Sequence, residues 1–111
     1  MPDEPPSDQL DPEDAKLVTL ARGARSRIAA VEGAALRDET GRTYASAAVA
    51  LASLQLSAVQ AVVAQAVAAG ARGVEAIAVV GPAGFTQVDP DGRSALRELA
   101  GDGVRVILVQ S

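Results

Sequence analysis

The feature that most constrains this chain is a long stretch without charge, which extends from residue 43 to residue 71. Inside it, residues 56–70 read LSAVQAVVAQAVAAG, which has the length of a helix and a glycine at its end. The polar side chains of this segment are Ser57, Gln60 and Gln65. A helix that is apolar on nearly every side must be covered by its own fold, by a second subunit or by a membrane.

A membrane span is not what this stretch predicts. Its apolar residues are mostly Ala, which contributes little insertion energy, and Gln55, Gln60 and Gln65 would place amide groups in the bilayer. The N-terminus is acidic and Pro-rich instead of basic and then apolar, so no secretory signal is predicted. We therefore expect a cytoplasmic protein, and the abundance of Ala, Val, Gly, Asp and Arg is typical of a bacterial chain.

The sequence contains neither Cys nor His. This absence excludes thiolate nucleophiles, imidazole bases, disulfides and the usual zinc ligands. Carboxylates, hydroxyls, Arg, Tyr44 and Lys16 remain for any catalysis, although a lone Tyr in a strand more often packs than reacts. The sequence accordingly predicts no metal and no cofactor.

The acidic residues are concentrated at the N-terminus. Six of the 14 acidic residues lie in residues 1–14, so the rest of the chain holds eight acidic against ten basic residues. This surplus is too small to predict a nucleic-acid partner, and the cluster Arg22, Arg25 and Arg27 is expected to be a solvated helix face, with phosphate or RNA contact as the alternative. Residues 1–11, which include three Pro, are predicted to be a disordered segment.

Hydrophobic periodicity and turn residues predict the element order α β β α β α β. Asp11 before Pro12 indicates a helix start, and residues 38–41 form a turn with Gly41 supplying a positive φ. The sequence predicts helices at 12–30, 56–70 and 92–100, and strands at 33–37, 42–50, 75–80 and 104–109. An antiparallel hairpin followed by helical crossovers predicts a mixed sheet of about four strands with helices on both faces, a three-layer α-β-α sandwich.

Three segments then suggest a family. They are E-G-A-A-L-R-D-E-T-G-R-T-Y at 32–44, A-V-A-A-G-A-R-G-V-E-A-I-A-V-V at 66–80, and P-D-G-R-S at 90–94. In their order and spacing the chain resembles the cytidine deaminase family, across residues 17–109. The resemblance implies one cytidine deaminase-like domain at residues 12–111. It also implies dimers or tetramers, which the family forms through the helix that carries its first catalytic motif.

The family's catalytic motifs are changed at every essential position. The resemblance places Ser57 on the first zinc ligand, which is Cys or His in the family, and Val59 on the proton-shuttle Glu. It places Asp91 and Ser94 on the two Cys of the second motif. Neutral serines and one carboxylate cannot hold a catalytic zinc tightly, and valine cannot transfer a proton. We expect Ser57 to cap its helix and Asp91 to be a helix-start acid, with a residual metal contact as the alternative for Asp91.

The family's substrate positions are changed as well. Its ribose-binding Asn and Glu correspond to Ala48 and Ala50, which offer only methyl groups. The strand at 104–109 is expected to form an open sheet edge, because the family elements that follow it have no counterpart here. The sequence thus predicts a non-catalytic family member that acts through assembly, as a homodimer or homotetramer, or through an unknown protein partner. The alternatives are a hydrolase of the deaminase family and a small-molecule sensor that uses the same cleft.

Overall fold

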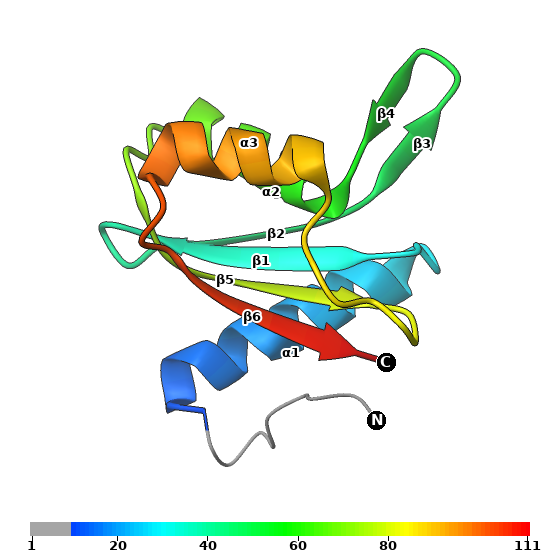
Figure 1. The fold of residues 1–111 in the computed structure, drawn as a ribbon, viewed down its shortest axis with the longest axis horizontal. Helices are drawn as coiled ribbons and strands as arrows, with labels where there is room; N and C mark the ends of the chain where they lie inside the picture. Colours follow the sequence, from blue (N-terminus) through cyan, green and yellow to red (C-terminus); the bar gives the residue numbers. More distant parts are fainter. Residues whose placement is uncertain (1–9) are drawn as a thin grey trace.

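The computed structural model describes residues 10–111. A four-stranded sheet with the order β2-β1-β5-β6 lies between α1 on one face and the pair α2 and α3 on the other (Figure 1). The helices and strands in chain order are α1 (Pro12–Arg27), β1 (Gly33–Asp38), β2 (Thr43–Ala47), β3 (Val49–Leu51), β4 (Leu54–Leu56), α2 (Ala58–Ala68), β5 (Val74–Gly81), α3 (Pro90–Ala100) and β6 (Arg105–Gln110). Of the predicted disordered segment 1–11, residues 1–9 lie outside the described residues. Leu10 packs against the core, and Asp11 caps α1.

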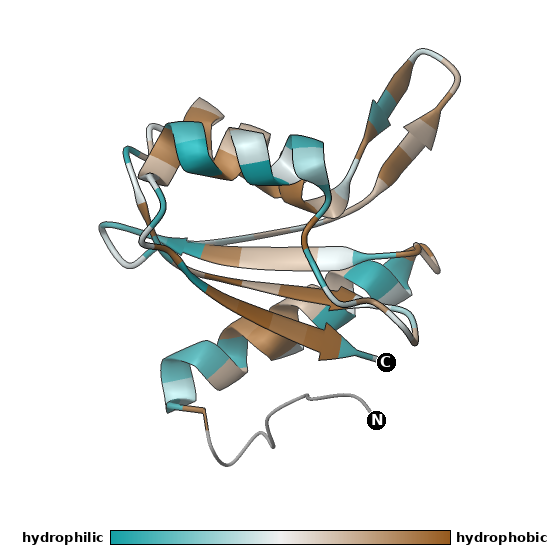
Figure 2. Cartoon of the chain, viewed as in Figure 1, coloured by the Kyte–Doolittle hydropathy of each residue, from teal (hydrophilic) through white to brown (hydrophobic). Residues whose placement is uncertain are grey.

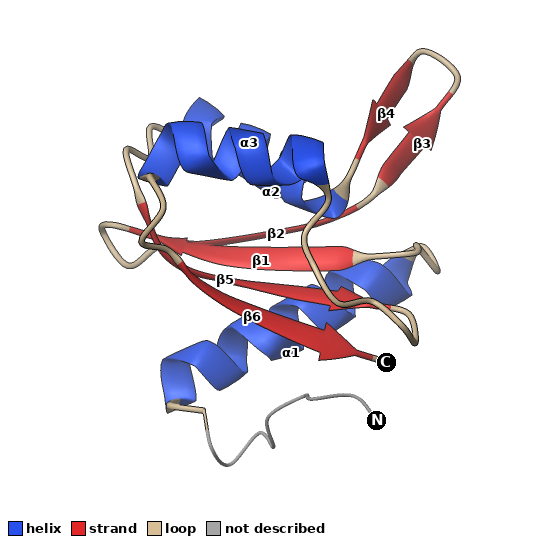
Figure 3. Ribbon diagram, in the orientation of Figure 1, coloured by secondary structure: helices blue, strands red, loops and turns tan. Residues whose placement is uncertain are grey.

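The sheet is mixed, as predicted. β1 pairs antiparallel with both β2 and β5, and β5 pairs in parallel with β6 through the α3 crossover. The three-layer α-β-α sandwich is therefore confirmed, and Figure 3 shows the strands enclosed between the helical layers. Among residues 10–111, no helix is both long and apolar enough to cross a membrane.

Two cores lie on opposite faces of the sheet because successive strand residues point to opposite sides. On β5, Ile77 and Val79 pack under α2 and α3, whereas Ala78 and Val80 pack against α1. All four are fully buried, which explains why this strand reads as a continuous apolar run (Figure 2). The small Ala side chains on the second face bring α1 close to the sheet.

The prediction of one continuous strand at residues 42–50 is wrong beyond Ala47. β2 ends at Ala47, and the chain enters a separate hairpin in which Val49 pairs with Leu56 and Leu51 pairs with Leu54. The hairpin turn, Ala52-Ser53, contains none of the Gly, Asn or Asp residues that mark a tight turn in sequence. The hairpin stands away from the main sheet and leaves Leu51 and Leu54 about half exposed (Figure 1).

Several helix boundaries also differ from prediction, and α2 spans Ala58–Ala68 instead of residues 56–70. α1 ends at Arg27 instead of residue 30, because Ala29 takes a left-handed conformation (φ 51°) and the Ala30 N–H bonds to the Arg25 carbonyl at 3.0 Å. The usual glycine signal for such an ending is missing there. α3 begins at Pro90, two residues early, because Asp89 acts as its N-cap.

The β1–β2 turn is held by a fully buried carboxylate. Asp38 accepts hydrogen bonds from Thr40 N (2.8 Å), Thr40 Oγ1 (2.6 Å), Arg42 N (3.1 Å) and Tyr44 Oη (2.9 Å). Gly41 has the positive φ expected of it, 92°. The bonds from Thr40 are the main reason that the pKa of Asp38 falls from 3.8 to about 2, helped by Tyr44 and opposed by burial.

These bonds predict an acid-dependent loss of stability. The folded pKa lies below the unfolded one, so the contribution of Asp38 is complete at about pH 6 and is lost as the pH falls from about 4 toward 2. We expect Asp38→Asn to flatten the fall in melting temperature between about pH 6 and pH 3. Ser94→Ala, at an exposed position without an ionisable group, serves as control and should keep the wild-type slope. An unchanged slope in Asp38→Asn would contradict this account.

Candidate functional site

A cavity of about 360 Å³ lies where the N-terminal ends of α2 and α3 meet the base of the β3–β4 hairpin. It brings together four positions singled out from the sequence: Ala48, Ala50, Ser57 and Asp91. These residues come from segments far apart in the chain, and the fold brings them to one cavity. Ser94, the remaining ligand position, is exposed on α3 and does not line this cavity.

Ser57 is fully engaged in capping α2. Its Oγ accepts a hydrogen bond from the Gln60 N–H at 3.0 Å, and the Gln60 Oε1 accepts one from the Ser57 N–H at 2.9 Å. This reciprocal pair is a capping box, which satisfies two of the free donors at a helix start. The predicted capping role is therefore present, and one of the two lone pairs of the hydroxyl oxygen is directed at the backbone.

Val59 fills the space between the starts of α2 and α3. It is fully buried, and a Cβ added to Gly92 would lie 2.8 Å from the Val59 Cβ and 2.6 Å from the Asp89 Oδ1. Real Cβ atoms do not approach so closely, so a glycine is needed at position 92 to let the two helices pack. The junction of the two helix starts is thus an apolar contact at Val59.

Asp89 also lines the cavity and was not predicted from the sequence. Its Oδ2 accepts a hydrogen bond from the Gly92 N–H at 2.7 Å, and its buried Oδ1 has no hydrogen-bond partner among residues 10–111. An available signal was the Asp-Pro pair at 89–90, which repeats the Asp11-Pro12 helix start. Asp91, by contrast, is exposed in the first turn of α3, where its charge favours the helix dipole.

Glu32 is the second lining residue that the sequence did not reveal. Burial raises the pKa of the Glu32 carboxyl, and the nearby Asp89 raises it further, against an opposing effect from Arg25. Nothing local in the sequence marked this residue, because its burial and its proximity to Asp89 arise only from the tertiary fold. Glu32, Asp89 and Asp91 together make the cavity acidic.

These donors do not fit the zinc ion on which the family's chemistry depends. Structural and catalytic zinc sites use thiolate and imidazole ligands, and the chain has neither. Within residues 10–111, no group of three or more Asp or Glu side chains is arranged to hold a metal ion. The cleft therefore offers carboxylates, amides and a hydroxyl already used in capping.

The mixed sheet, the two helix starts that meet at the cleft and the order of the elements define a cytidine deaminase-like α/β domain. A family model described as cytidine deaminase-like matches residues 10–111, so the chain belongs to this family. No curated protein sequence matches the chain.

Solved structures agree with this assignment. The chain is 28% identical to a cytidine deaminase from Burkholderia pseudomallei, with a TM-score of 0.74 over 86% of this chain and 85% of that one. It is 25% identical to a cytidine deaminase from Mycobacterium tuberculosis, with a TM-score of 0.73 over 88% and 85% of the two chains. A cytidine deaminase from Mycobacterium leprae, 21% identical with a TM-score of 0.66 over 84% and 85%, shares the fold.

The capping geometry generates a direct test of what Ser57 does. Ser57→Ala removes the acceptor for the Gln60 N–H and should lower the free energy of unfolding by about 1 kcal/mol, measured by urea denaturation. Ser57→Asp keeps a capping oxygen and should recover most of the loss. Ser94→Ala, on the exposed side of α3, is the control and should change stability by less than about 0.5 kcal/mol. Equal stability of Ser57→Ala and wild type would rule out the capping role.

Proposed function

We propose that this chain is a non-catalytic member of the cytidine deaminase-like family, which acts through homo-oligomeric assembly or through binding a protein partner. The observation that carries the proposal is the buried contact between Val59 and Gly92. This contact fills, with apolar atoms, the position where the family motif has a proton-transferring carboxylate. A side chain without an ionisable group cannot act as a general acid or base.

The other positions of the cleft support the same proposal. Ser57, Asp91 and Ser94 stand where the family has metal ligands, and they lack the thiolate and imidazole groups that zinc requires. Ala48 and Ala50 stand where the family binds ribose, so each unpaired ribose hydroxyl buried there would cost about 1–3 kcal/mol. In this proposal residues 12–111 are a single domain that follows the acidic segment 1–11, and the protein works in the bacterial cytoplasm.

The loss of catalysis is tested with the purified full-length protein. Elemental analysis should find no stoichiometric zinc after incubation with zinc and dialysis, because the cleft lacks the family's ligands. An assay that follows cytidine deamination should give the rate of a blank without protein. A zinc-loaded cytidine deaminase in the same buffer is the positive control for both measurements.

Two outcomes would replace the proposal with an alternative. One zinc ion per chain, or turnover above the blank, would make the chain a working hydrolase. The cavity of about 360 Å³ at Ser57 and Asp91 is large enough for a small molecule, which is the observation that favours a sensor. A saturable rise in melting temperature with one member of a nucleoside panel would support that second role.

The charge-free stretch supports assembly. Its exposed apolar side chains lie in two places, which we together call the uncharged surface: Leu51 and Leu54 beside the hairpin turn, and Ala64, Val67 and Ala68 toward the end of α2. Val67 is 52% exposed and Leu51 58% exposed, and their segment contributes no charged side chain beside them. Contact with a second copy would remove this surface from water.

The uncharged surface predicts a homodimer or homotetramer. Light scattering at micromolar concentration should give a multiple of the monomer mass. Val67→Lys and Leu54→Lys should shift the protein toward monomer, because a charge in an apolar interface loses its hydration. Ile28→Lys, an equally exposed apolar residue at the end of α1, is the matched control and should leave the mass unchanged. A wild-type protein with the mass of a monomer would contradict the prediction.

A further inference from the structure

β6 is an open edge of the sheet. It pairs with β5 from Arg105 opposite Ala76 to Gln110 opposite Gly81, and among residues 10–111 no strand lies on its other side (Figure 3). Natural edge strands are usually protected by bulges, prolines or charges. The β5–β6 ladder has no bulge, and after Arg105 the strand reads V-I-L-V-Q, without Pro or charge. The outer N–H and C=O groups of β6 are therefore free to pair with another strand.

The two faces of β6 are covered unequally. Ile107 and Val109 are buried in the core beneath α1, whereas Val106 is 41% exposed on the face that carries α3. Two hollows of about 190 and 300 Å³ lie along that face and share Arg93, Leu96 and Val106. Because they share a wall, they form one groove between α3 and β6, which we call the α3–β6 groove. Its apolar residues are Val88, Leu96, Val104, Val106 and Leu108.

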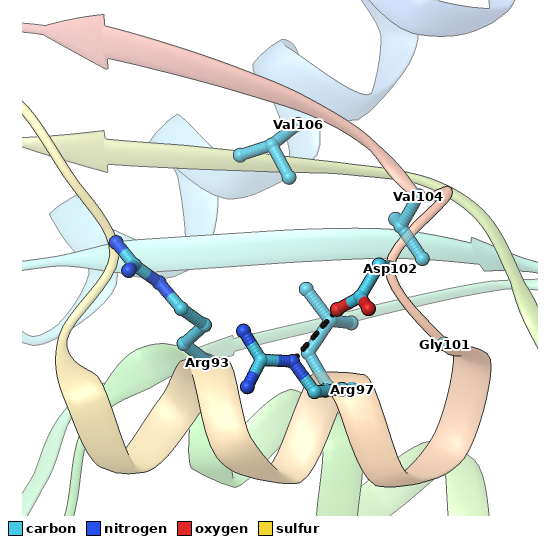
Figure 4. Close-up of a pocket in the computed structure, with 7 residues that line it drawn as sticks. Arg93, Arg97, Gly101, Asp102, Val104 and Val106 are labelled. Carbon is cyan, nitrogen blue, oxygen red and sulfur yellow. Dashed lines mark hydrogen bonds and ion pairs between the residues drawn. The ribbon is translucent and has the colours of Figure 1, made fainter.

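Two arginines one helical turn apart border the α3–β6 groove from α3. The side chain of Arg93 extends away from α3 and that of Arg97 runs along α3 toward Arg93, with Val104 and Val106 across from them (Figure 4). Arg97 Nε bonds to Asp102 Oδ1 at 2.7 Å, while the bond from Arg93 Nη2 to Gln87 Oε1 is long, at 3.5 Å. Arg93, Arg97 and Asp102 are the charged residues of the lining, so the groove carries one net positive charge, centred near Arg93.

This charge decides which occupant fits. In a symmetric pairing of two β6 strands, both α3 helices would lie on the same face of the joined sheet, and the arginine rims would face each other. A second copy would therefore meet like charges, while an acidic segment would meet an opposite charge at Arg93. We propose that the α3–β6 groove binds an extended, acidic segment of a partner protein, which adds to β6 as a further strand.

The added strand would use both the outer backbone groups of β6 and the α3–β6 groove beside it. Its backbone bonds to the free groups of β6, and its alternate side chains face the groove. On that face an apolar side chain covers Val106 and Leu108, and a carboxylate two residues away reaches Arg93. The inference rests on the proposed function and deepens it by naming the class of the partner. It uses neither the cavity at Ser57 and Asp91 nor the uncharged surface.

The test uses the full-length protein and a fluorescent, N-acetylated peptide with the repeat Thr-Val-Thr-Glu. A second peptide with Lys in place of Glu is the matched control. We expect saturable binding of the Glu peptide at low salt, with a Kd at least about tenfold lower than that of the Lys peptide. In an NMR titration the amide shifts should be confined to β6 and α3.

Two variants locate the site. Arg93→Ala combined with Arg97→Ala leaves Asp102 as the only charge of the groove and should weaken binding of the Glu peptide by about tenfold or more. Arg27→Ala, another helix-surface arginine, should leave it unchanged. Val106→Lys puts a charge on the groove floor at a partly exposed position, so it should abolish binding while the melting temperature stays near that of wild type.

Several results would overturn the proposal. The first is no binding of the Glu peptide, or equal binding of the Lys peptide. The second is binding only after deletion of residues 1–9, which would assign the groove to the chain's own acidic N-terminal segment. The third is a Val106→Lys variant that loses self-association, which would assign the edge to a second copy. Each could occur while the zinc, deamination and Val67→Lys experiments give their expected results, so the two proposals fail separately.

Discussion

The arrangement of the layers depends on one buried carboxylate, Asp14 in the first turn of α1. It accepts hydrogen bonds from Arg37 Nη2 on β1 at 3.1 Å and from Arg105 Nε on β6 at 2.9 Å. Burial tends to raise the pKa of Asp14, but the bonds from Arg105 and Arg37 outweigh it and lower the pKa, so the group stays ionised. Arg37 also bonds to Glu75 on β5 at 2.8 Å. One network therefore ties α1 to a central pair of strands and to the edge strand.

The junction between the starts of α2 and α3 lies on the opposite face of the sheet from α1 (Figure 1). Here that junction is held by the packing of Val59 on Gly92 and by two caps, Ser57 on α2 and Asp89 on α3. Apolar contact and backbone capping stabilise this junction, and our proposal gives them the part that metal coordination plays in the family.

Much of the fold was predictable because its signals are local. The Asp11-Pro12 start of α1, the Gly41 turn and the capping box at Ser57 each depend on residues a few positions apart. The β3–β4 hairpin was not predicted because its turn lacks the Gly, Asn and Asp residues that mark tight turns. The end of α1 was not predicted because Ala29, and not a glycine, takes the positive φ there. In the cleft, the sequence indicated Ser57 and Asp91 but not Glu32 or Asp89, whose role arises from contact between distant segments.

The sequence by itself determined the composition of the site: a chain without Cys and His cannot supply the family's zinc ligands, wherever its residues lie. It also determined that the segment 43–71 would need cover, since a helix without charge cannot face water on all sides. Tertiary structure alone decided that Val59 meets Gly92, that Glu32 lies near Asp89, and that the α3–β6 groove stays open with a positive rim. These are contacts between elements, and they exist only once chain topology and side-chain volume have fixed which surfaces touch.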